Sequence, residues 1–372
     1  MTLPAPAAFL TALLEAALRP RWPLFDAAHE TALRLFNGFL EGYLHLVAEV
    51  FAKTLVLHSY SQANGQTDPW QQQAELFYRS RLPWLEAVVV KQRGVRRSST
   101  CSAASNGDRI ATRLCEHGVW YALDLLRHQD TTFYLDTRGL RQWAIQNLKG
   151  KSVLNTFAYT GSLGVAAMAG GAHQVLHIDR NRDFLELAQA SYALNGFPVR
   201  AEDFWAMDFF PAMSALRRAG ELFDCVFLDP PFFSVTGKGR VDLVSESARL
   251  INKVRPLVTD GGWLVAVNNA LFVSGAAYLR TLQALCADGY MSIETLIPVP
   301  EDCTGYPSTR VRSLPSDPAP FNHATKIAVL RLRRKECRAT RETGWYNPRR
   351  DGLYRLARHR NYRPRPSSRC HH

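Results

Sequence analysis

The feature that most constrains this chain is a pair of prolines that directly follows an apolar run. The run extends from Cys225 to Leu228 and leads into the sequence Asp229-Pro230-Pro231-Phe232-Phe233. Each proline ring removes a backbone donor and fixes φ, so a buried strand has to end here. Open α/β sheets bind ligands at the carboxyl ends of such strands, where Asp229 could accept from an amino group and a phenylalanine could stack on a flat ring. An ordinary strand end with an aspartate cap is the alternative interpretation.

A strand, a small-residue turn and a helix are predicted upstream, over residues 151–171. Gly161 and Gly164 in the turn would let the backbone come close to a ligand. A further strand at 174–179 ends in Asp179, roughly twenty residues past the turn, where a carboxylate suits the two hydroxyls of a ribose. The turn is neither the dinucleotide Gly-x-Gly-x-x-Gly pattern nor a Walker loop, because no Lys-Ser/Thr follows it.

Several short motifs follow one another in a fixed order along residues 30–335. They are Arg34-Leu-Phe-Asn-Gly38 with Glu41-Gly42, Phe133-Tyr-Leu-Asp-Thr-Arg138, Asn155-x-Phe157-x-Tyr159-Thr160-Gly161, Asp179, Glu202-Asp203-Phe204 and Asp229-Pro230-Pro231. This order resembles the class I S-adenosylmethionine-dependent methyltransferases. More narrowly, it resembles the bacterial 23S rRNA methyltransferases of the cytosine-C5 type I branch and their guanine-N7 relatives. The single motifs are moderately specific, and their order is highly specific.

The resemblance implies a pocket for S-adenosyl-L-methionine. Its expected contacts are Phe133, Asp136, Asn155, Phe157, Tyr159, Thr160, Gly161, Asp179, Asp203, Phe204 and Asp229. Among these, Asp179 would hold the ribose, Asp203 would accept from the adenine amino group, and Phe204 would pack on the adenine face. Each acid also has a plain alternative: Asp179 as a helix cap, Asp203 as a solvated loop acid and Asp136 as a turn residue.

The resemblance also implies a place for the target base, at Asp229, Pro230 and Pro231. Cytosine-C5 methylation needs a thiolate that adds to the ring, and the resembled enzymes keep this cysteine after the next strand. Here that strand, at 262–267, leads to Asn268 and Asn269 without a thiol. We therefore expect methylation at nitrogen, with Asn268 among the catalytic residues, because amides can donate and accept along a base edge. A plain turn at the two asparagines is the alternative.

The remaining cysteines do not restore the covalent route. Cys225 falls inside the buried strand, where a thiol is inert packing. Cys286 is expected in a helix and Cys303 in a loop beyond the sheet, so only Cys303 could swing in. The chain has seven cysteines without Cys-x-x-Cys pairs, which argues against a disulfide framework and against a zinc ribbon. No metal is expected, no apolar run reaches the length of a membrane span, and the composition favours a cytoplasmic enzyme.

The net charge of +12 is concentrated in one segment. From Arg331 to the end, 14 Lys and Arg stand against three acids. Aromatic residues lie among these arginines, a pattern that suits phosphate neutralisation and base stacking, while low hydrophobicity and prolines predict disorder without a partner. Arg93, Arg96 and Arg97 form a smaller basic group in a predicted loop. RNA is therefore the expected partner, although both segments could also be merely solvated.

Periodicity completes the prediction of the fold class. Apolar stretches at 33–36, 47–51 and 54–60 predict a small antiparallel sheet, 70–82 a helix and 112–123 a hairpin. Strands at 174–179, 223–228 and 262–267 alternate with amphipathic stretches at 182–195, 243–257 and 275–287, which predicts a Rossmann-like parallel sheet in an α/β fold. Strands at 293–297 and 326–332 would finish the sheet as an antiparallel pair.

The expected domains are a helical lead-in at 1–24, a small β-rich accessory domain for RNA at 25–130, a methyltransferase domain at 131–334 and a basic tail at 335–372. The predicted function is methylation of RNA, at a ribosomal RNA base, with S-adenosylmethionine. Two other functions remain open at this point. The first is a methyltransferase for a protein amide or a small molecule, and the second is a non-catalytic RNA-binding protein with a relict cofactor pocket.

Overall fold

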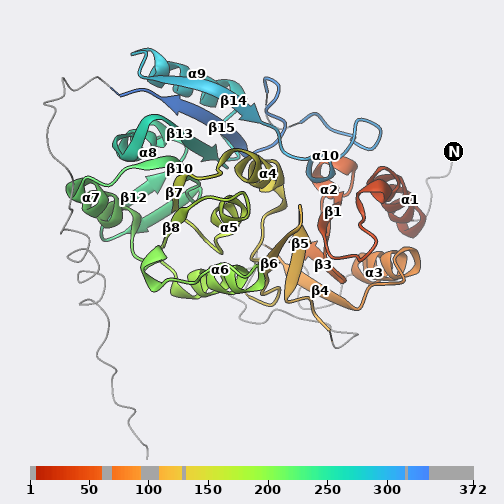
Figure 1. Ribbon diagram of the computed structural model, residues 1–372. Coiled ribbons are helices and arrows are strands. Elements are labelled where there is room, and N and C mark those ends of the chain that lie inside the picture. The colour runs from red at the N-terminus through yellow and green to blue at the C-terminus, as the bar shows by residue number, and fades with distance from the viewer. Residues whose placement is uncertain (1–5, 61–68, 94–108, 128–130, 315–316, 335–372) are drawn as a thin grey trace, which may run out of the picture.

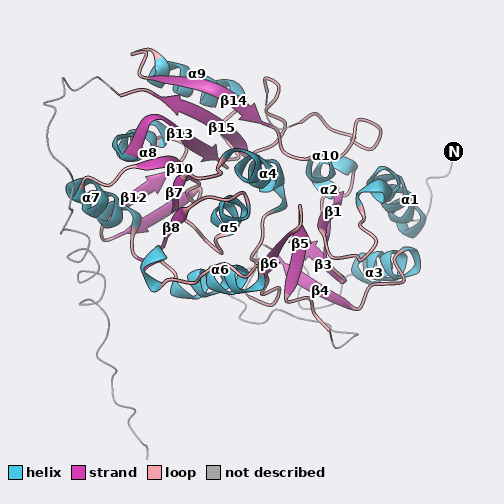
Figure 2. Cartoon of the chain, viewed as in Figure 1, coloured by secondary structure: helices cyan, strands magenta, loops and turns pink. Residues whose placement is uncertain are grey.

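The computed structural model of the protein describes residues 6–60, 69–93, 109–127, 131–314 and 317–334. The basic tail and the loop carrying Arg96 and Arg97 lie outside these residues. The chain forms two main sheets that lie side by side, with the N-terminal third on one side and the remainder on the other (Figures 1 and 2).

The first sheet has four strands in the order β1-β2-β3-β4. The elements of this region are α1 (Pro6–Leu18), the 3-10 helix η1 (Arg19–Leu24), β1 (Ala32–Asn37), α2 (Gly38–Glu41), β2 (Leu46–Phe51), β3 (Thr54–Ser59), α3 (Pro69–Arg81) and β4 (Ala87–Gln92). The first three strands pair antiparallel, as predicted, whereas β4 pairs parallel to β3 because the helix α3 lies between them.

Both faces of this sheet are covered. Residues of α1 and α3 such as Leu14 and Tyr78 pack on one face, together with Leu57. On the other face, Val56 packs with Leu114 of the predicted hairpin β5 (Arg113–Glu116) and β6 (Val119–Ala122), and the same core continues to the helix α6 (Arg182–Leu194). This double coverage explains why every residue of β2 and β3 is buried, although half of each strand would face water in an open antiparallel sheet.

Buried ion pairs tie the first sheet to the rest of the chain. Arg138 forms ion pairs with Glu116 and Asp302 and donates to the carbonyl oxygen of Ala32 in β1. Arg141 forms a second buried ion pair with Glu116. Removing one partner would leave a buried charge uncompensated, which costs about 3–5 kcal/mol, so these pairs hold the two sheets in one arrangement.

The second sheet has seven strands in the order β14-β15-β13-β10-β7-β8-β9. Its elements are η2 (Leu135–Thr137), α4 (Arg138–Asn147), β7 (Ser152–Thr156), α5 (Ser162–Ala169), β8 (Gln174–Asp179), α6, η3 (Ala201–Asp203), β9 (Phe204–Ala206), α7 (Phe209–Ala219), β10 (Phe223–Leu228), β11 (Phe233–Thr236), β12 (Gly239–Asp242), α8 (Ser247–Val254), η4 (Arg255–Leu257), β13 (Val258–Asn268), α9 (Gly275–Cys286), β14 (Met291–Ile297), α10 (Glu301–Thr304) and β15 (Lys326–Leu332).

Alternating residues of the central strands face two helical layers, as a period of two requires. Cys225 and Phe227 of β10 pack with α4 and α5, whereas Val226 and Leu228 pack with α7, α8 and α9. The five strands β7 to β10 and β13 are parallel, and β15 and β14 complete the sheet antiparallel, as predicted. A Rossmann-like α/β fold beside a small β-rich sheet is therefore confirmed.

Three local predictions need correction. Residues 233–242 form the antiparallel hairpin β11–β12, a segment for which the sequence pattern predicts no element. The amphipathic stretch at 243–257 is an α-helix only over Ser247–Val254, and the 3-10 helix η4 follows it. Cys303 lies in the short helix α10 rather than in a loop, and it is fully buried.

Candidate cofactor and substrate site

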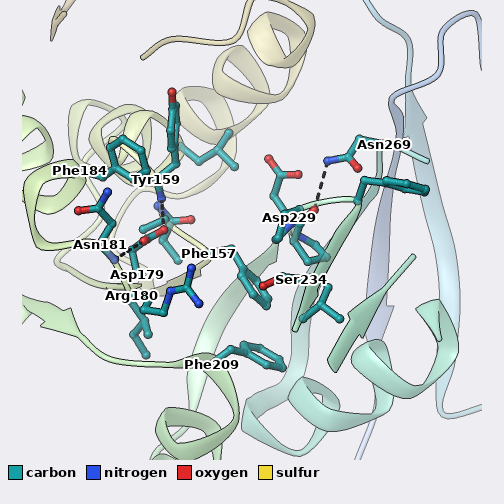
Figure 3. Close-up of a pocket in the computed structure, with 18 of the residues that line it drawn as sticks. Phe157, Tyr159, Asp179, Arg180, Asn181, Phe184, Phe209, Asp229, Ser234 and Asn269 are labelled. Atoms are coloured by element: carbon teal, nitrogen blue, oxygen red, sulfur yellow. Dashed lines mark hydrogen bonds between the residues drawn. The ribbon is translucent and has the colours of Figure 1, made fainter. Parts of the chain in front are cut away.

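A cavity of about 640 Å³ opens at the carboxyl ends of β7, β8, β10 and β13. This is the edge at which open parallel sheets bind ligands, and its size lies in the range of ligand pockets. Asp179 and Asp229 lie at its two ends, with Phe157 between them (Figure 3). Four acids and one basic side chain line it: Asp136, Asp179, Asp208, Asp229 and Arg180. The lining thus favours a ligand with positive charge.

The loop after β7 is tightly folded against β8. Phe157 and Tyr159 both adopt the left-handed region, each with φ of 51°, which is uncommon for bulky residues and persists where the surroundings enforce it. Gly161, with φ of 77°, begins α5, and a Cβ atom there would lie 2.5 Å from the Cβ of Ala188. Glycine at 161 is therefore required by the close packing on Ala188, while Phe157 and Tyr159 line the cavity wall.

Asp179 is held in place by two backbone groups. Its Oδ2 accepts from the amide of Tyr159 and its Oδ1 from the amide of Asn181, both at 2.8 Å. Burial raises the pKa of Asp179 above its ordinary value, and these hydrogen bonds act against that effect. Each oxygen keeps a lone pair for a further donor. The cap of α6 is Asn181, which accepts from the amide of Asp183, so the helix-cap alternative does not describe Asp179.

The Asp-Phe pair expected at the adenine lies away from the cavity. Asp203 accepts from Gln174 at 3.2 Å, and Phe204 stacks on His177 with 5.0 Å between ring centroids. Neither residue lines the cavity. The cause is the register of β9, in which Ala206 pairs with Asp179, so the carboxyl edge of the sheet is reached only after residue 206.

A second Asp-Phe pair occupies that edge. Met207, Asp208 and Phe209 follow β9 directly and line the cavity. Asp208 also caps α7 by accepting from the amide of Phe210 at 3.2 Å, and Phe209 stacks on Phe157 with 4.5 Å between centroids. The sequence contains Asp-Phe twice, at 203–204 and 208–209, and the duplication was the signal that could have revealed the second pair.

Asp229 shares its end of the cavity with a second acid, Asp136. Burial, and then the nearby charge of Asp136, raise the pKa of Asp229 to about 7. Asp136 accepts from the hydroxyl of Thr325, and burial lowers the pKa of the neighbouring His323, so that ring carries no compensating charge near neutral pH. A carboxyl group that titrates near neutrality inside a cleft is a candidate for proton transfer or for binding a cation.

Of the other residues expected to contact the cofactor, some line the cavity and others pack behind its wall. Asn155, Phe157, Tyr159, Asp136, Pro230 and Pro231 line the cavity. Phe133, Thr160 and Gly161 do not: Phe133 packs under the guanidinium of Arg141, 4.0 Å from the ring centroid, and Thr160 donates to the carbonyl oxygen of Thr132. Tyr134, next to Phe133 in the same motif, lines the cavity as Asp136 does, and it packs on Tyr159.

The two asparagines at the end of β13 have different environments. Asn268 is fully buried, donates to the carbonyl oxygen of Leu243 and to Ser247, and accepts from the amide of Ala270. It does not line the cavity, so its expected catalytic position is wrong. Asn269 lines the cavity instead, and its Nδ2 donates to the carbonyl oxygen of Pro230 at 3.1 Å (Figure 3).

No cysteine of the described ranges lines this cavity. Cys225 and Cys303 are fully buried, and burial raises the pKa of both thiols above their ordinary value. The described residues also contain no cluster of His, Cys, Asp or Glu arranged to hold a metal ion. Within the same residues, none of the helices has the length and apolar character needed to cross a bilayer.

The model of the S-adenosylmethionine-dependent methyltransferase family matches residues 85–314, and the chain belongs to this family. The ribosomal RNA large subunit methyltransferase I of Photobacterium profundum is 35% identical over 149 residues, covering 40% of this chain and 37% of that protein. The methyltransferase K/L of Shewanella amazonensis is 29% identical over 210 residues, covering 56% and 28%. The Bacillus subtilis protein YwbD is 28% identical over 276 residues, covering 71% and 67%. The alignments thus cover only 37% of the Photobacterium protein's length and 28% of the Shewanella protein's length.

Solved structures agree with the fold. The crystal structure of SMU.776 complexed with SAH superposes with a TM-score of 0.76 at 20% identity, covering 89% of this chain and 83% of that one. A methyltransferase from Agrobacterium tumefaciens gives a TM-score of 0.56 at 15% identity, covering 83% and 92%.

The cavity fits the cofactor of this family. S-adenosylmethionine carries a positive sulfonium and an ammonium group, and the lining has three more acids than bases. Asp179 offers free lone pairs for ribose hydroxyls, and Phe157, Ile178 and Phe209 offer an apolar wall for a flat adenine. The residues that line the cavity therefore suit S-adenosylmethionine.

Proposed function

We propose that this protein transfers the methyl group of S-adenosylmethionine to a nitrogen atom of an RNA base, in ribosomal RNA. The single observation that carries the proposal is one cavity with Asp179 at one end and the Asp229-Pro230-Pro231 loop at the other. The names of the curated relatives, which concern ribosomal RNA, support the substrate class. A ribosomal RNA substrate and the scattered cysteines also support a cytoplasmic location.

In this proposal Asp179 binds the ribose and Asp208 with Phe209 binds the adenine. Asp136 lies at the methionine end, close to Asp229, and Tyr134 lines the cavity beside Tyr159. Asp203, Phe204, Phe133, Thr160 and Gly161 then act as support for the loops rather than as contacts, because none of them lines the cavity. The bound cofactor supplies an activated methyl group on a sulfonium.

Asp229 and Asn269 would orient the target base between the Pro230 backbone and the cofactor. Transfer requires the nitrogen lone pair to lie in line with the methyl–sulfur bond, and positioning of this kind supplies much of the rate. As the carbon–nitrogen bond forms, the carbon–sulfur bond breaks and its electron pair remains on sulfur. Where the target is an amino nitrogen, one proton leaves it, and the ionised carboxylate of Asp229 is placed to accept that proton.

The buried cysteines support transfer to nitrogen rather than to carbon. Cytosine-C5 chemistry needs a thiolate at the ring, and the cavity lining contains no cysteine within the described residues. Replacing Cys303 or Cys286 by alanine should leave turnover within a few-fold, and RNA containing 5-fluorocytosine should form no covalent adduct. Trapping of such an adduct, or 5-methylcytosine as the product, would contradict nitrogen transfer.

The decisive experiment is nucleoside mass spectrometry. Protein-free large-subunit ribosomal RNA is incubated with the protein and labelled S-adenosylmethionine, digested, and its nucleosides are analysed. The expected product is one N-methylated base that is absent with Asp229→Ala. Label found only in protein or small molecules would favour a methyltransferase for a protein amide or a small molecule. Absence of saturable cofactor heat in calorimetry would favour a non-catalytic RNA-binding protein.

A further inference from the structure

The β11–β12 hairpin has two faces of opposite character. In an antiparallel pair, directly opposed side chains share a face. Ser234 pairs with Val241 and Thr236 with Gly239, and all four line the cavity. The other face therefore carries Phe233 and Val235, opposite Asp242 and Arg240. Phe233 is 55% exposed and Val235 is 62% exposed, so the face that points away from the cavity presents apolar surface to solvent.

A second pair of exposed apolar residues lies on the adjacent loop. Leu271 and Phe272 follow Asn269 at the end of β13, and they are 67% and 83% exposed. The hydrogen bond from Asn269 to the carbonyl oxygen of Pro230 joins this loop to the segment that leads into the hairpin. The two loops follow neighbouring parallel strands, β10 and β13, so both begin at the same end of the cavity.

The loop that carries Leu271 and Phe272 is anchored on both sides. The buried ammonium of Lys326 donates to the carbonyl oxygens of Ala270 and Val273, each at 2.9 Å. These two residues bracket the exposed pair, so the side chains are held outward by a fixed backbone. Ordered apolar side chains in solvent next to a cavity mark a binding surface rather than packing.

The neighbouring charges indicate what binds there. Lys238 lies in the turn of the hairpin and is exposed, and the half-exposed side chain of Arg240 forms ion pairs with Asp242 and Glu246. Arg249, close by through its ion pair with Glu246, is also half exposed. Exposed aromatic rings with Lys and Arg beside them are typical of surfaces that bind single-stranded nucleic acid by stacking bases and neutralising phosphates.

We propose that Phe233, Val235, Leu271 and Phe272, with Lys238 and Arg240, form a surface that binds the unpaired nucleotides flanking the target base. We call it the rim surface. The inference rests on the proposed function, because the inner face of the same hairpin lines the cavity where the base would enter. One ribbon thus contacts RNA on its outer face and bounds the reaction site with its inner face.

The test separates the two faces of the hairpin. Affinity for a fluorescent single-stranded oligouridylate and for S-adenosylmethionine is measured for Phe233→Ala, Phe272→Ala and the control Val199→Ala, which removes a 47% exposed apolar side chain outside the cavity lining. We expect each phenylalanine variant to weaken RNA binding about tenfold, with cofactor affinity and melting temperature unchanged. Phe233→Tyr should retain binding, whereas Phe233→Leu should not, since only a ring stacks.

Several results would overturn the rim surface. These are RNA affinity equal in Phe233→Ala, Phe272→Ala and the control, equal loss in Phe233→Tyr and Phe233→Leu, or self-association of the wild type that disappears in the alanine variants. The proposed function can fail separately: wild type that binds oligouridylate through these rings but methylates no RNA would leave the rim surface standing. Conversely, if the protein methylates ribosomal RNA but Phe233→Ala and Phe272→Ala bind RNA as tightly as the wild type, only the rim surface is refuted.

Discussion

Asn269 donates from Nδ2 to the carbonyl oxygen of Pro230, 3.1 Å away, and so joins the ends of β10 and β13 across the mouth of the cavity. A proline carbonyl can only accept, so this contact fixes which amide atom of Asn269 faces the loop. The interaction orients both the Asp-Pro-Pro backbone and the asparagine side chain before any substrate arrives.

The first prediction separates Asn269 from its neighbour. Asn269→Ala should lower kcat at least tenfold with little change in melting temperature, because the residue lies at the cavity and orients the Pro230 loop. Asn268→Ala should instead destabilise the protein by about 1–3 kcal/mol, the cost of leaving buried hydrogen-bonding groups unpaired. Thermal unfolding and steady-state kinetics on both variants check the pair, and the opposite pattern would restore Asn268 to the site.

The second prediction concerns the ribose end. Asp179→Ala should weaken S-adenosylmethionine binding by about 1.5–3 kcal/mol, since a charged acceptor is lost and the amide of Tyr159 is released. The matched control is Asp183→Ala, an exposed acid at the start of α6 that pairs with Arg127. Calorimetry should show normal affinity for the control. Equal affinities for both variants would contradict the assignment of Asp179 as the residue that binds the ribose.

The third prediction distinguishes the two Asp-Phe pairs. Asp208→Ser keeps an oxygen that can cap α7 but shortens the side chain at the cavity. It should weaken cofactor binding by about 1.5 kcal/mol, whereas Asp203→Ser should change it hardly at all, because Asp203 lies outside the cavity lining and accepts from Gln174. A larger loss of cofactor affinity in Asp203→Ser than in Asp208→Ser would place the adenine at Asp203, as the sequence predicts.

The sequence predicted those parts of the site that strong local patterns determine. Two prolines end β10 at Leu228, so Asp229 had to lie at the edge of the sheet. The acid at the end of β8 is similarly determined, since the apolar run and the strand end together at Asp179. The family resemblance, resting on the order of such ends, is confirmed by the matched family model.

The structure differs from the sequence-based prediction where the position of a side chain depends on the register of a strand or on the face of the strand to which it points. The strand β9 has only three residues, too few for periodicity to locate, so its register with β8 alone determines that Asp208 rather than Asp203 reaches the edge. Asn268 and Asn269 differ only in the side to which successive residues of an extended chain point. The hairpin β11–β12 had a usable signal, the Gly237-Lys238-Gly239 turn between alternating residues.

The last prediction follows from the carboxyl pair at the substrate end. The pKa of Asp229 is raised to about 7 from an ordinary 3.8, by burial and by Asp136. Between these values the folded protein binds a proton that the unfolded chain lacks, so this group's contribution to stability falls as pH rises from about 4 to 7. If the ionised carboxylate serves the transfer, kcat/KM should rise with pH through an inflection near 7.

Substitution of the partner acid tests the assignment. Asp136→Asn removes the repelling charge, so the inflection should move to lower pH. Asp229→Asn should abolish the inflection and lower the rate across the whole range. The control is Asp183→Asn, which should keep the wild-type profile because it lies outside the cavity lining. An unchanged inflection in Asp229→Asn would mean that another group titrates, and that Asp229 holds the base without exchanging a proton.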